Sequence, residues 1–340
     1  MTTQDIESVA RALVAEGKGI LAADESLGTI KKRFAGINLD STKETRRSYR
    51  EVLFTTPGIE AFISGVILFD ETVRQSAGNG TPFPAVLAQK GIIPGIKVDT
   101  GAKNLAGFPG EAITEGLDGL RDRLEEYRGL GARFAKWRAV ITIGTGIPTR
   151  FCIDANAHAL ARYAALCQEA GLVPIVEPEV LMEGNHDIVR CEEVTAAVLK
   201  SVFSQIQEHR VMPEGMLLKP NMVLSGKGCP RQAGVSEVAE ATVRCLSRTV
   251  PVAVPGIVFL SGGQSPELAT EHLNAMNARG GHPWELSFSY ARALQEPTLN
   301  AWKGEAANVP AAQKAFHHRA RCNSAARYGR YSKEMEAVAA

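Results

Sequence analysis

Short runs of apolar, β-favouring residues recur along the chain, and glycine, proline or polar residues bound each run. Runs of about four to eight such residues are typical of strands that are buried on both faces. Enough chain lies between successive runs for at least one helix. The pattern therefore predicts eight strands, at residues 19–24, 62–69, 92–99, 134–143, 172–180, 215–223, 256–263 and 285–290.

The stretches between these runs carry apolar residues at helical spacing. Residues 41–54 open with the capping-box pattern Ser41-x-x-Glu44, and residues 119–131 place Leu120 and Leu124 on one face before a glycine. Strands that alternate with helices predict a parallel sheet covered by helices. Eight such units that close on themselves form a (β/α)8 TIM barrel, an α/β fold of about 250 residues plus insertions. The pattern leaves a doubly wound open sheet as the alternative.

Composition supports one large unit. Of the 340 residues, 45% are hydrophobic, and no linker composition, low-complexity tract or repeat divides the chain. We expect a single barrel domain over residues 1–340, with residues 328–340 as a short, loose C-terminal tail.

Charge and cysteine content exclude several classes of partner. The 38 basic and 37 acidic side chains leave a net charge of +1, which offers no overall attraction for nucleic acid or an anionic membrane. No apolar run approaches the roughly 18 residues of a membrane-spanning helix, and the first residues do not fit a secretory signal. Six cysteines without a C-x-x-C pair favour reduced thiols in a cytoplasmic protein over a disulfide framework.

Charged side chains cluster near the ends of the predicted strands, where TIM barrels carry their active sites. They are Asp24, Lys97, Asp99, Lys136, Arg138, Glu177, Glu179, Lys219 and Arg292, together with the polar Asn221 and Ser261. Because side chains alternate along a strand, Lys136 and Arg138 share one face, as do Glu177 and Glu179. Any one of these residues alone is explained as well by a structural ion pair. Their occurrence on six strands together favours a functional site.

Lys219 interrupts the apolar run "LLKPNMV". Lysine is rarely buried unless it is paired, so its place in an interior strand requires a reason. Burial and a neighbouring ammonium group both lower the pKa of a lysine, which gives the neutral amine that attacks a carbonyl group. This setting predicts an imine-forming lysine.

Two segments carry features of anion sites. "LSGGQSPE" follows the seventh strand, and its paired glycines let backbone N–H groups approach a phosphate before a helix that we expect to begin near Ser265. Arg292 after the eighth strand could clamp the same anion. "DESLGTIKKR" adds the hydroxyl groups of Ser26 and Thr29 and three basic residues after the first strand. Paired glycines alone are also typical of a tight turn, but two anion sites around a lysine predict a substrate phosphorylated at both ends.

Other motifs are weak. The glycines of residues 144–149 lack the third glycine of a dinucleotide fingerprint, and the sequence contains no P-loop. The seven histidines form no H-E-x-x-H pattern, and we interpret the adjacent His317 and His318 as solvated helix surface. We therefore expect neither a catalytic metal nor a cofactor.

The segments "GKGILAADES", "RFAKWR", "PIVEPEV", "LLKPNMV", "FLSGGQS" and "FSYARALQ" together resemble the class I fructose-bisphosphate aldolases, over nearly the whole chain from about residue 16 to Tyr331. The resemblance implies a (β/α)8 barrel. It also implies reversible, metal-independent cleavage of fructose 1,6-bisphosphate to dihydroxyacetone phosphate and glyceraldehyde 3-phosphate, in glycolysis and gluconeogenesis. A cytoplasmic homotetramer is implied as well.

The resemblance also implies roles for individual residues. Lys219 would form the Schiff base, and the positive charge of Lys136 would hold it neutral. Glu177 would be the acid and base of carbinolamine dehydration, with Glu179 as its hydrogen-bonded second carboxylate. Asp24 would orient the carbinolamine and take the hydroxyl proton as the carbon–carbon bond breaks.

The two phosphates would be held at opposite ends of the cleft. The implied substrate contacts are Ser26, Thr29, Arg33, Arg46, Lys97, Arg138, Ser261, Gly262, Gly263, Ser289 and Arg292. Ala291 stands where the family usually has glycine, and Thr29 where it usually has serine. Animal members end in a long tail with a terminal tyrosine that enters the site, whereas this sequence ends at Ala340, so we expect proton exchange on the enamine to be slower or handled otherwise.

Two other hypotheses remain at the level of the sequence. One is another imine-forming barrel aldolase that acts on a different sugar phosphate. The other is a non-catalytic protein that binds a sugar phosphate on the same fold. The combination of Lys219, Glu177, Asp24 and Lys136 disfavours the second hypothesis, because binding alone requires no neutral lysine.

Overall fold

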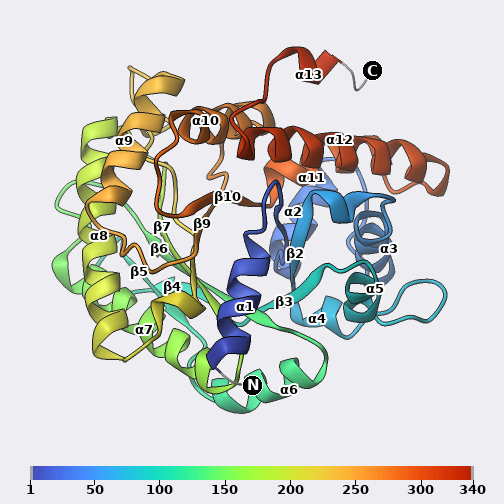
Figure 1. Ribbon diagram of the computed structural model, residues 1–340, viewed down its shortest axis with the longest axis horizontal. Coiled ribbons are helices and arrows are strands. Elements are labelled where there is room, and N and C mark those ends of the chain that lie inside the picture. The colour runs from blue at the N-terminus through green and yellow to red at the C-terminus, as the bar shows by residue number, and fades with distance from the viewer. Residues whose placement is uncertain (1–2, 338–340) are drawn as a thin grey trace.

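The computed structural model describes residues 3–337, and within them eight parallel strands form a closed barrel (Figure 1). The order around the barrel is β1-β10-β9-β8-β7-β6-β3-β2, and β1 also pairs with β2. The strands are β1 (Gly19–Ala23), β2 (Ile63–Leu68), β3 (Ile93–Lys97), β6 (Phe134–Ile141), β7 (Val173–Val180), β8 (Leu217–Leu218), β9 (Gly256–Phe259) and β10 (Glu285–Tyr290). This confirms the predicted (β/α)8 barrel and excludes the doubly wound sheet.

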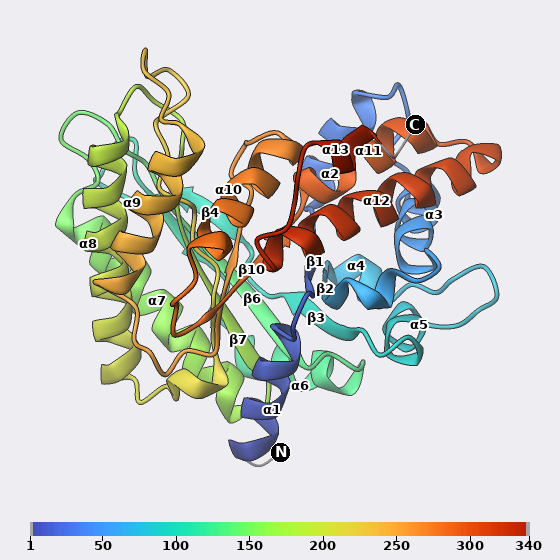
Figure 2. The same ribbon diagram turned by 45° about the horizontal axis from the view of Figure 1, so that its top comes forward.

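Helices cover the outside of the barrel (Figure 2). They are α1 (Thr3–Leu13), α2 (Leu27–Ala35), α3 (Lys43–Phe54), α4 (Asp70–Val73), α5 (Phe83–Gln89), α6 (Leu120–Gly129), α7 (Arg150–Glu169), α8 (Ile188–Glu208), α9 (Val235–Ser247), α10 (Pro266–Arg279), α11 (Arg292–Trp302), α12 (Val309–Arg327) and α13 (Glu334–Ala337). Single turns of 3₁₀ helix occur at Ile59–Ala61, Pro213–Gly215 and Ala306–Asn308. An antiparallel hairpin of β4 (Gly101–Asn104) and β5 (Ala112–Glu115), which the pattern did not predict, follows β3.

The sixth barrel strand is much shorter than residues 215–223, the predicted range. Its ladder covers only Leu217–Leu218, although the Lys219 N–H still donates to the Val176 carbonyl oxygen at 2.8 Å. Pro220 has no N–H to continue the ladder. The side-chain oxygen of Asn221 instead accepts the Val180 N–H at 2.9 Å. Lys219 therefore lies where regular pairing ends, at the carboxyl end of the strand.

Apolar side chains close the opposite, N-terminal end of the barrel. Ile6 and Leu13 of α1 form one buried cluster with Phe134 and Leu217 from inside the barrel. A Cβ atom on Gly95 would lie 2.3 Å from the Phe134 ring, so only glycine leaves room for this ring. Packing thus fills the inside of the barrel at this end.

The N-cap of helix α3 lies one residue later than predicted. The cap residue is Thr42, which exchanges hydrogen bonds with Thr45, so the predicted Ser41–Glu44 capping box was wrong. Ser41 instead accepts a hydrogen bond from Arg46 at 3.2 Å. Both residue pairs have the same spacing, and the choice between them depends on where the chain leaves the preceding turn.

The segment after α12 contacts α12 through Tyr331 and Glu336, in contrast to the predicted loose tail. Tyr331 is buried, and Glu336 of α13 pairs with Arg319 of α12. His318, which we expected at the solvated surface, is also buried there, while its neighbour His317 is half-buried and packs edge-on against Phe62. Residues 338–340 of the predicted tail lie outside the described residues.

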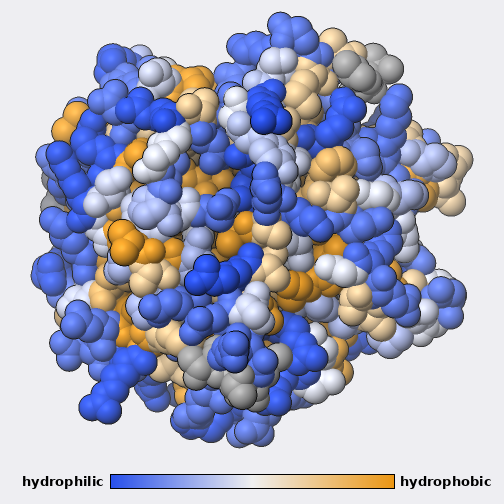
Figure 3. Space-filling view, in the orientation of Figure 1, coloured by the Kyte–Doolittle hydropathy of each residue, from blue (hydrophilic) through white to orange (hydrophobic). Residues whose placement is uncertain are grey.

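The surface is mixed in polarity. Hydrophilic side chains cover most of the outline of the face in Figure 3, and hydrophobic ones lie nearer its middle. In the described part of the chain, no helix combines the length and the apolar content needed to cross a membrane. The six cysteines are all unpaired thiols.

Candidate active site

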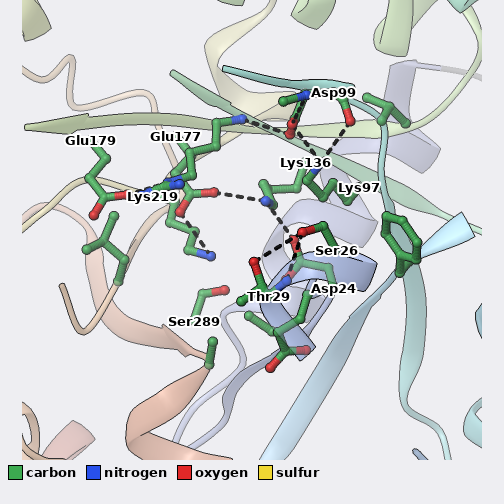
Figure 4. Close-up of a pocket in the computed structure, with 18 of the residues that line it drawn as sticks. Asp24, Ser26, Thr29, Lys97, Asp99, Lys136, Glu177, Glu179, Lys219 and Ser289 are labelled. Carbon is green, nitrogen blue, oxygen red and sulfur yellow. Dashed lines mark hydrogen bonds and ion pairs between the residues drawn. The ribbon is translucent and has the colours of Figure 1, made fainter. Parts of the chain in front are cut away.

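A cavity of about 1100 Å³ opens at the carboxyl ends of the barrel strands. The catalytic and substrate-binding residues implied by the resemblance line it, except Arg46, and the strand-end candidate Asn221 does not line it (Figure 4). The residues brought together are Asp24, Ser26, Thr29, Arg33, Lys97, Lys136, Arg138, Glu177, Glu179, Lys219, Ser261, Gly262, Gly263, Ser289 and Arg292. They come from all parts of the sequence, so only the closed barrel places them on one surface.

Two lysines and two carboxylates form the centre of the cavity. Lys136 Nζ lies 2.6 Å from Asp24 Oδ2 and 3.3 Å from Glu177 Oε2. Lys219 Nζ lies 3.3 Å from the other oxygen of Glu177, Oε1. Glu177 therefore bridges the two amino groups, and Figure 4 shows both lysines directed toward it. All four side chains are buried, and Lys136 and Lys219 are each only 3% exposed.

The two lysines differ in the number of carboxylates that they contact. Burial raises the pKa of Asp24, but the ammonium groups of Lys136 and Lys219 outweigh burial and hold this pKa well below its usual value. For Lys136, burial lowers the pKa, and the carboxylates of Asp24 and Glu177 outweigh it, so this pKa lies above the usual value. Asp24 and Lys136 thus form an ionised pair. Lys219 contacts one carboxylate, and Lys136 contacts two.

Glu179 differs from its implied partner. The resemblance implied a hydrogen bond to Glu177, but Glu179 Oε2 accepts a hydrogen bond from Arg138 Nε on the neighbouring strand β6. Two ionised carboxylates repel each other, whereas a guanidinium group stabilises the outer one. The hydrogen-bond partner of Glu179 is therefore Arg138 and not Glu177.

The loop after β1 and the end of β3 form one polar wall. Ser26 caps α2 by accepting the Thr29 N–H at 3.4 Å, and the two hydroxyl groups lie 3.1 Å apart. Lys97 Nζ lies 2.7 Å from Asp99 Oδ1 and donates to the Asp99 carbonyl oxygen at 2.8 Å. Hydroxyl groups, a helix N-terminus and a fixed ammonium group suit an anionic ligand.

Two arginines from α2 and α3 have different surroundings. Arg33 lines the cavity and pairs with Glu25, which is buried and also pairs with Arg50 at 2.5 Å. Arg46 forms a two-pronged pair with Glu71, in which both N–O distances are 2.7 Å, and does not line the cavity. The carboxylate of Glu71 therefore holds Arg46 away from the predicted position.

The loops after β9 and β10 form the opposite wall. Gly262 and Gly263 have φ angles of 47° and 79°, which are left-handed values that favour glycine. Ser265 caps α10 as predicted. The residue before α11 is Ala291, whose methyl group cannot accept a hydrogen bond, so the first N–H groups of α11 remain available beside Arg292. This wall offers backbone N–H groups and a guanidinium group to an anion.

The cavity also contains residues that the sequence did not assign to the site. Arg74, Arg123 and Tyr127 line it. The Arg123 guanidinium donates to the Val98 carbonyl oxygen at 2.9 Å and so supports the loop after β3. Arg74 directly follows α4, and Arg123 and Tyr127 lie on α6, so none of them belongs to a predicted strand end.

The sequence profile of the family described as "Fructose-bisphosphate aldolase class-I" matches residues 5–340. The chain belongs to this family. The "Probable fructose-bisphosphate aldolase class 1" of Xanthomonas campestris pv. campestris is 59% identical over 332 residues, which are 97% of this chain and 99% of that protein. The "Fructose-bisphosphate aldolase 6, cytosolic" of Arabidopsis thaliana is 56% identical over 316 residues, which are 93% and 88% of the two chains.

A solved structure agrees with this assignment. The fructose-bisphosphate aldolase of Plasmodium falciparum, in complex with TRAP and a small-molecule inhibitor, superposes with a TM-score of 0.96. It is 52% identical in sequence, and the match covers 97% of this chain and 95% of the other. As a class I aldolase, this chain is a lyase that cleaves fructose 1,6-bisphosphate reversibly through a lysine Schiff base, in glycolysis and gluconeogenesis.

Proposed function

We propose that Lys219 is the lysine that forms the Schiff base. The observation that carries this assignment is the unequal sharing of carboxylates between the two buried lysines. Lys136 is held by Asp24 and Glu177, whereas Lys219 contacts Glu177 alone, at 3.3 Å. An amine must give up its proton before it attacks a ketone, and the lysine with fewer ionic partners does so more readily.

Glu177 serves the dehydration step. Attack of Lys219 Nζ on the ketone carbon gives a carbinolamine, and loss of its hydroxyl group as water requires a proton. Glu177 lies between the two lysines, takes the proton that the Lys219 amine gives up as it attacks, and passes this proton to the leaving hydroxyl group, while the lone pair of the nitrogen forms the C=N bond. Lys136 remains an ammonium group beside Glu177 and stabilises the carboxylate that results.

Asp24 is the base of carbon–carbon cleavage. The lowered pKa of Asp24 keeps it ionised at neutral pH, as a base must be. It takes the proton of the substrate hydroxyl group, the C–O bond becomes the aldehyde, and the electron pair of the broken C–C bond moves into the iminium to form an enamine. Protonation of the enamine and hydrolysis of the imine then release the ketone product and return Lys219.

The two polar walls orient the substrate. Ser261, Gly262, Gly263 and Arg292 bind the phosphate nearer the ketone, with Arg33 close by. Ser26, Thr29, Lys97 and Arg138 bind the distal phosphate. Arg46 is paired with Glu71 and takes no part in this proposal, and Glu179 acts through Arg138. The support is that basic and hydroxyl side chains line the cavity on both sides of Lys219.

We also propose that the single-domain chain works as a cytoplasmic homotetramer. The Arabidopsis relative is described as cytosolic, and the resemblance to the aldolase family implies four subunits. Light scattering of the purified protein tests the assembly, and a monomer mass would contradict it.

Borohydride reduction in the presence of substrate tests the nucleophile. Reduction converts the imine into a stable amine, so the peptide that contains Lys219 should gain the mass of the ketone phosphate fragment. Lys136 is the matched control, because it is an equally buried lysine in the same cavity. An adduct on Lys136, or none on Lys219, would overturn the assignment.

A further inference from the structure

We propose that His318, Cys322 and Glu336 form a zinc-type metal site on the outside of the barrel, separate from the aldolase site. His318 and Cys322 lie one turn apart on α12, and Glu336 comes from α13, which packs against that helix. One potential ligand atom from each side chain lies within 4.8 Å of the other two. Imidazole, thiolate and carboxylate are the ligand types that Zn²⁺ prefers.

The distances within the cluster fit tetrahedral coordination. Cys322 Sγ lies 3.5 Å from His318 Nε2, and this nitrogen lies 3.2 Å from Glu336 Oε2. Around a tetrahedral zinc with metal–ligand bonds of about 2.0–2.3 Å, the corresponding separations are roughly 3.6 Å and 3.3 Å. These two separations therefore match those around one ion, and the ligand atoms of Cys322 and Glu336 also lie within 4.8 Å of each other.

The three side chains converge on one another, and Glu336 accepts from both of its neighbours when the thiol and the imidazole Nε2 are protonated. A single ring nitrogen, His318 Nε2, faces both the sulfur of Cys322 and the carboxylate of Glu336. If Nε2 carries a proton, it donates to Glu336 and cannot accept from the thiol. If Nε2 is unprotonated, it accepts from the thiol and faces the carboxylate lone pairs. A divalent cation satisfies all three atoms at once.

The surrounding residues orient the carboxylate as in known metal sites. Arg319 and the Tyr331 hydroxyl group both donate to Glu336 Oε1, the latter at 2.7 Å, and so leave Oε2 directed at His318. Arg319 is itself fixed by hydrogen bonds to Thr270 Oγ1 (2.6 Å) and the Pro266 carbonyl oxygen (3.1 Å). Such outer contacts fix the geometry of metal ligands and raise affinity.

Binding would join the C-terminal segment to α12. Cys322 must lose its proton to bind, so one proton passes to solvent for each ion. The thiolate and the carboxylate then carry two negative charges, and the ion shares the carboxylate of Glu336 with the guanidinium group of Arg319. The ion would hold α13 in place beside α12, where Figures 1 and 2 both draw it.

Metal binding to untagged protein tests the site. After removal of metal with a chelator, the wild-type chain should bind one equivalent of Zn²⁺ by calorimetry, with release of a proton from the thiol. With Co²⁺ as the probe, a sulfur-to-cobalt charge-transfer band should appear in the near ultraviolet, since Cys322 is the ligand that produces it. The affinities for Zn²⁺ and for Co²⁺ should each fall at least about tenfold in His318→Ala and in Cys322→Ser.

The neighbouring His317→Ala variant is the matched control, because His317 occupies the same helix and contacts Phe62 instead of the cluster. Cys229→Ser is the control for the thiol, since Cys229 lies outside the cluster. Both controls should bind zinc as the wild type does. Cleavage activity, which depends on the other site, reports that each variant is folded. Absence of stoichiometric zinc binding by the wild type, or equal binding by His318→Ala or Cys322→Ser, would overturn the proposal.

Discussion

At the N-terminal end of the barrel, Arg327 of α12 is buried and donates hydrogen bonds to the backbone oxygens of Ala15 (3.0 Å), Val14 and Lys18, while it pairs with Glu285. At the carboxyl end, Lys136 and Lys219 are equally hidden, but they share the carboxylate of Glu177. One Glu177 oxygen lacks an aligned hydrogen bond among the described residues, although Lys136 is within ion-pair distance.

The difference separates charges that stabilise the fold from charges that perform chemistry. A guanidinium group does not lose its proton in proteins, so Arg327 can serve only as a fixed donor. Amino and carboxyl groups that share partners can exchange protons as intermediates form. Burial alone is therefore a poor guide to function, and the number and kind of partners are better guides.

The largest expected effect comes from Lys219→Met at the carboxyl end. Without the amine no imine forms, and kcat should fall by on the order of 10⁴-fold or more. Urea unfolding should give a midpoint at least as high as that of the wild type, because the variant no longer buries an amine. Cleavage at the wild-type rate would remove Lys219 from the mechanism.

Glu177→Gln should have the next largest effect. The amide keeps the shape of the side chain but cannot give up a proton, so kcat should fall by about 10²–10⁴-fold. Borohydride should trap less adduct on Lys219 in the same time, since dehydration of the carbinolamine becomes slow. Glu285→Gln at the other end is the matched control. A normal trapping rate in Glu177→Gln would exclude Glu177 from dehydration.

Arg327→Met should show the reverse behaviour. Removal of the guanidinium group leaves buried carbonyl oxygens without donors, which should lower the free energy of unfolding by about 3 kcal/mol. The activity of the molecules that remain folded should not change, because Arg327 lies outside the cavity. Urea titrations compare this variant with Arg330→Met, an exposed position. A fall in kcat without loss of stability would contradict the contrast between the two ends.

The smallest expected effect is the loss of folding stability at acid pH through Asp24. Because the pKa of Asp24 in the folded chain lies below its ordinary value of 3.8, the unfolded chain takes up this proton first. The stability contributed by ionised Asp24 is present above pH 3.8 and is lost as the pH falls further, with a slope of at most about 1.4 kcal/mol per pH unit. Asp24→Asn should lack this component in unfolding curves between pH 2 and 5, as a range of roughly this width covers the titration. Parallel curves for the two proteins would refute it.

The sequence predicted the parts of the fold that depend on periodicity. Each of the eight barrel strands lies within a predicted apolar run. The cavity residues on these strands were predicted from the ends of those runs. The β4–β5 hairpin was missed because its residues are mostly exposed or half-buried and carry no apolar run. Strand β8 was overextended because its apolar run continues past Pro220, where the ladder stops.

Contacts between side chains that are distant in the sequence could not be predicted from it. The resemblance placed Arg46 in the cleft, but Glu71, 25 residues later, holds it elsewhere. Glu179 was assigned to Glu177, but it pairs with Arg138 across the strands. His318 appeared polar and solvated, and the contact with α13 buries it. In each case a distant side chain decides the position, and single-sequence patterns contain no such information.

Arg327 also has a consequence for the order in which the chain is made. The carbonyl oxygen of Val14, which it binds, precedes it by 313 residues. Chains fold as units while they leave the ribosome from the N-terminus onward. The hydrogen bonds from Arg327 to the segment after α1 can therefore form only after α12 has been synthesised. The barrel likewise closes only when β10 is available to pair with β1. Helix α12 completes the N-terminal end of the barrel, and its Arg327 fixes the segment between α1 and β1.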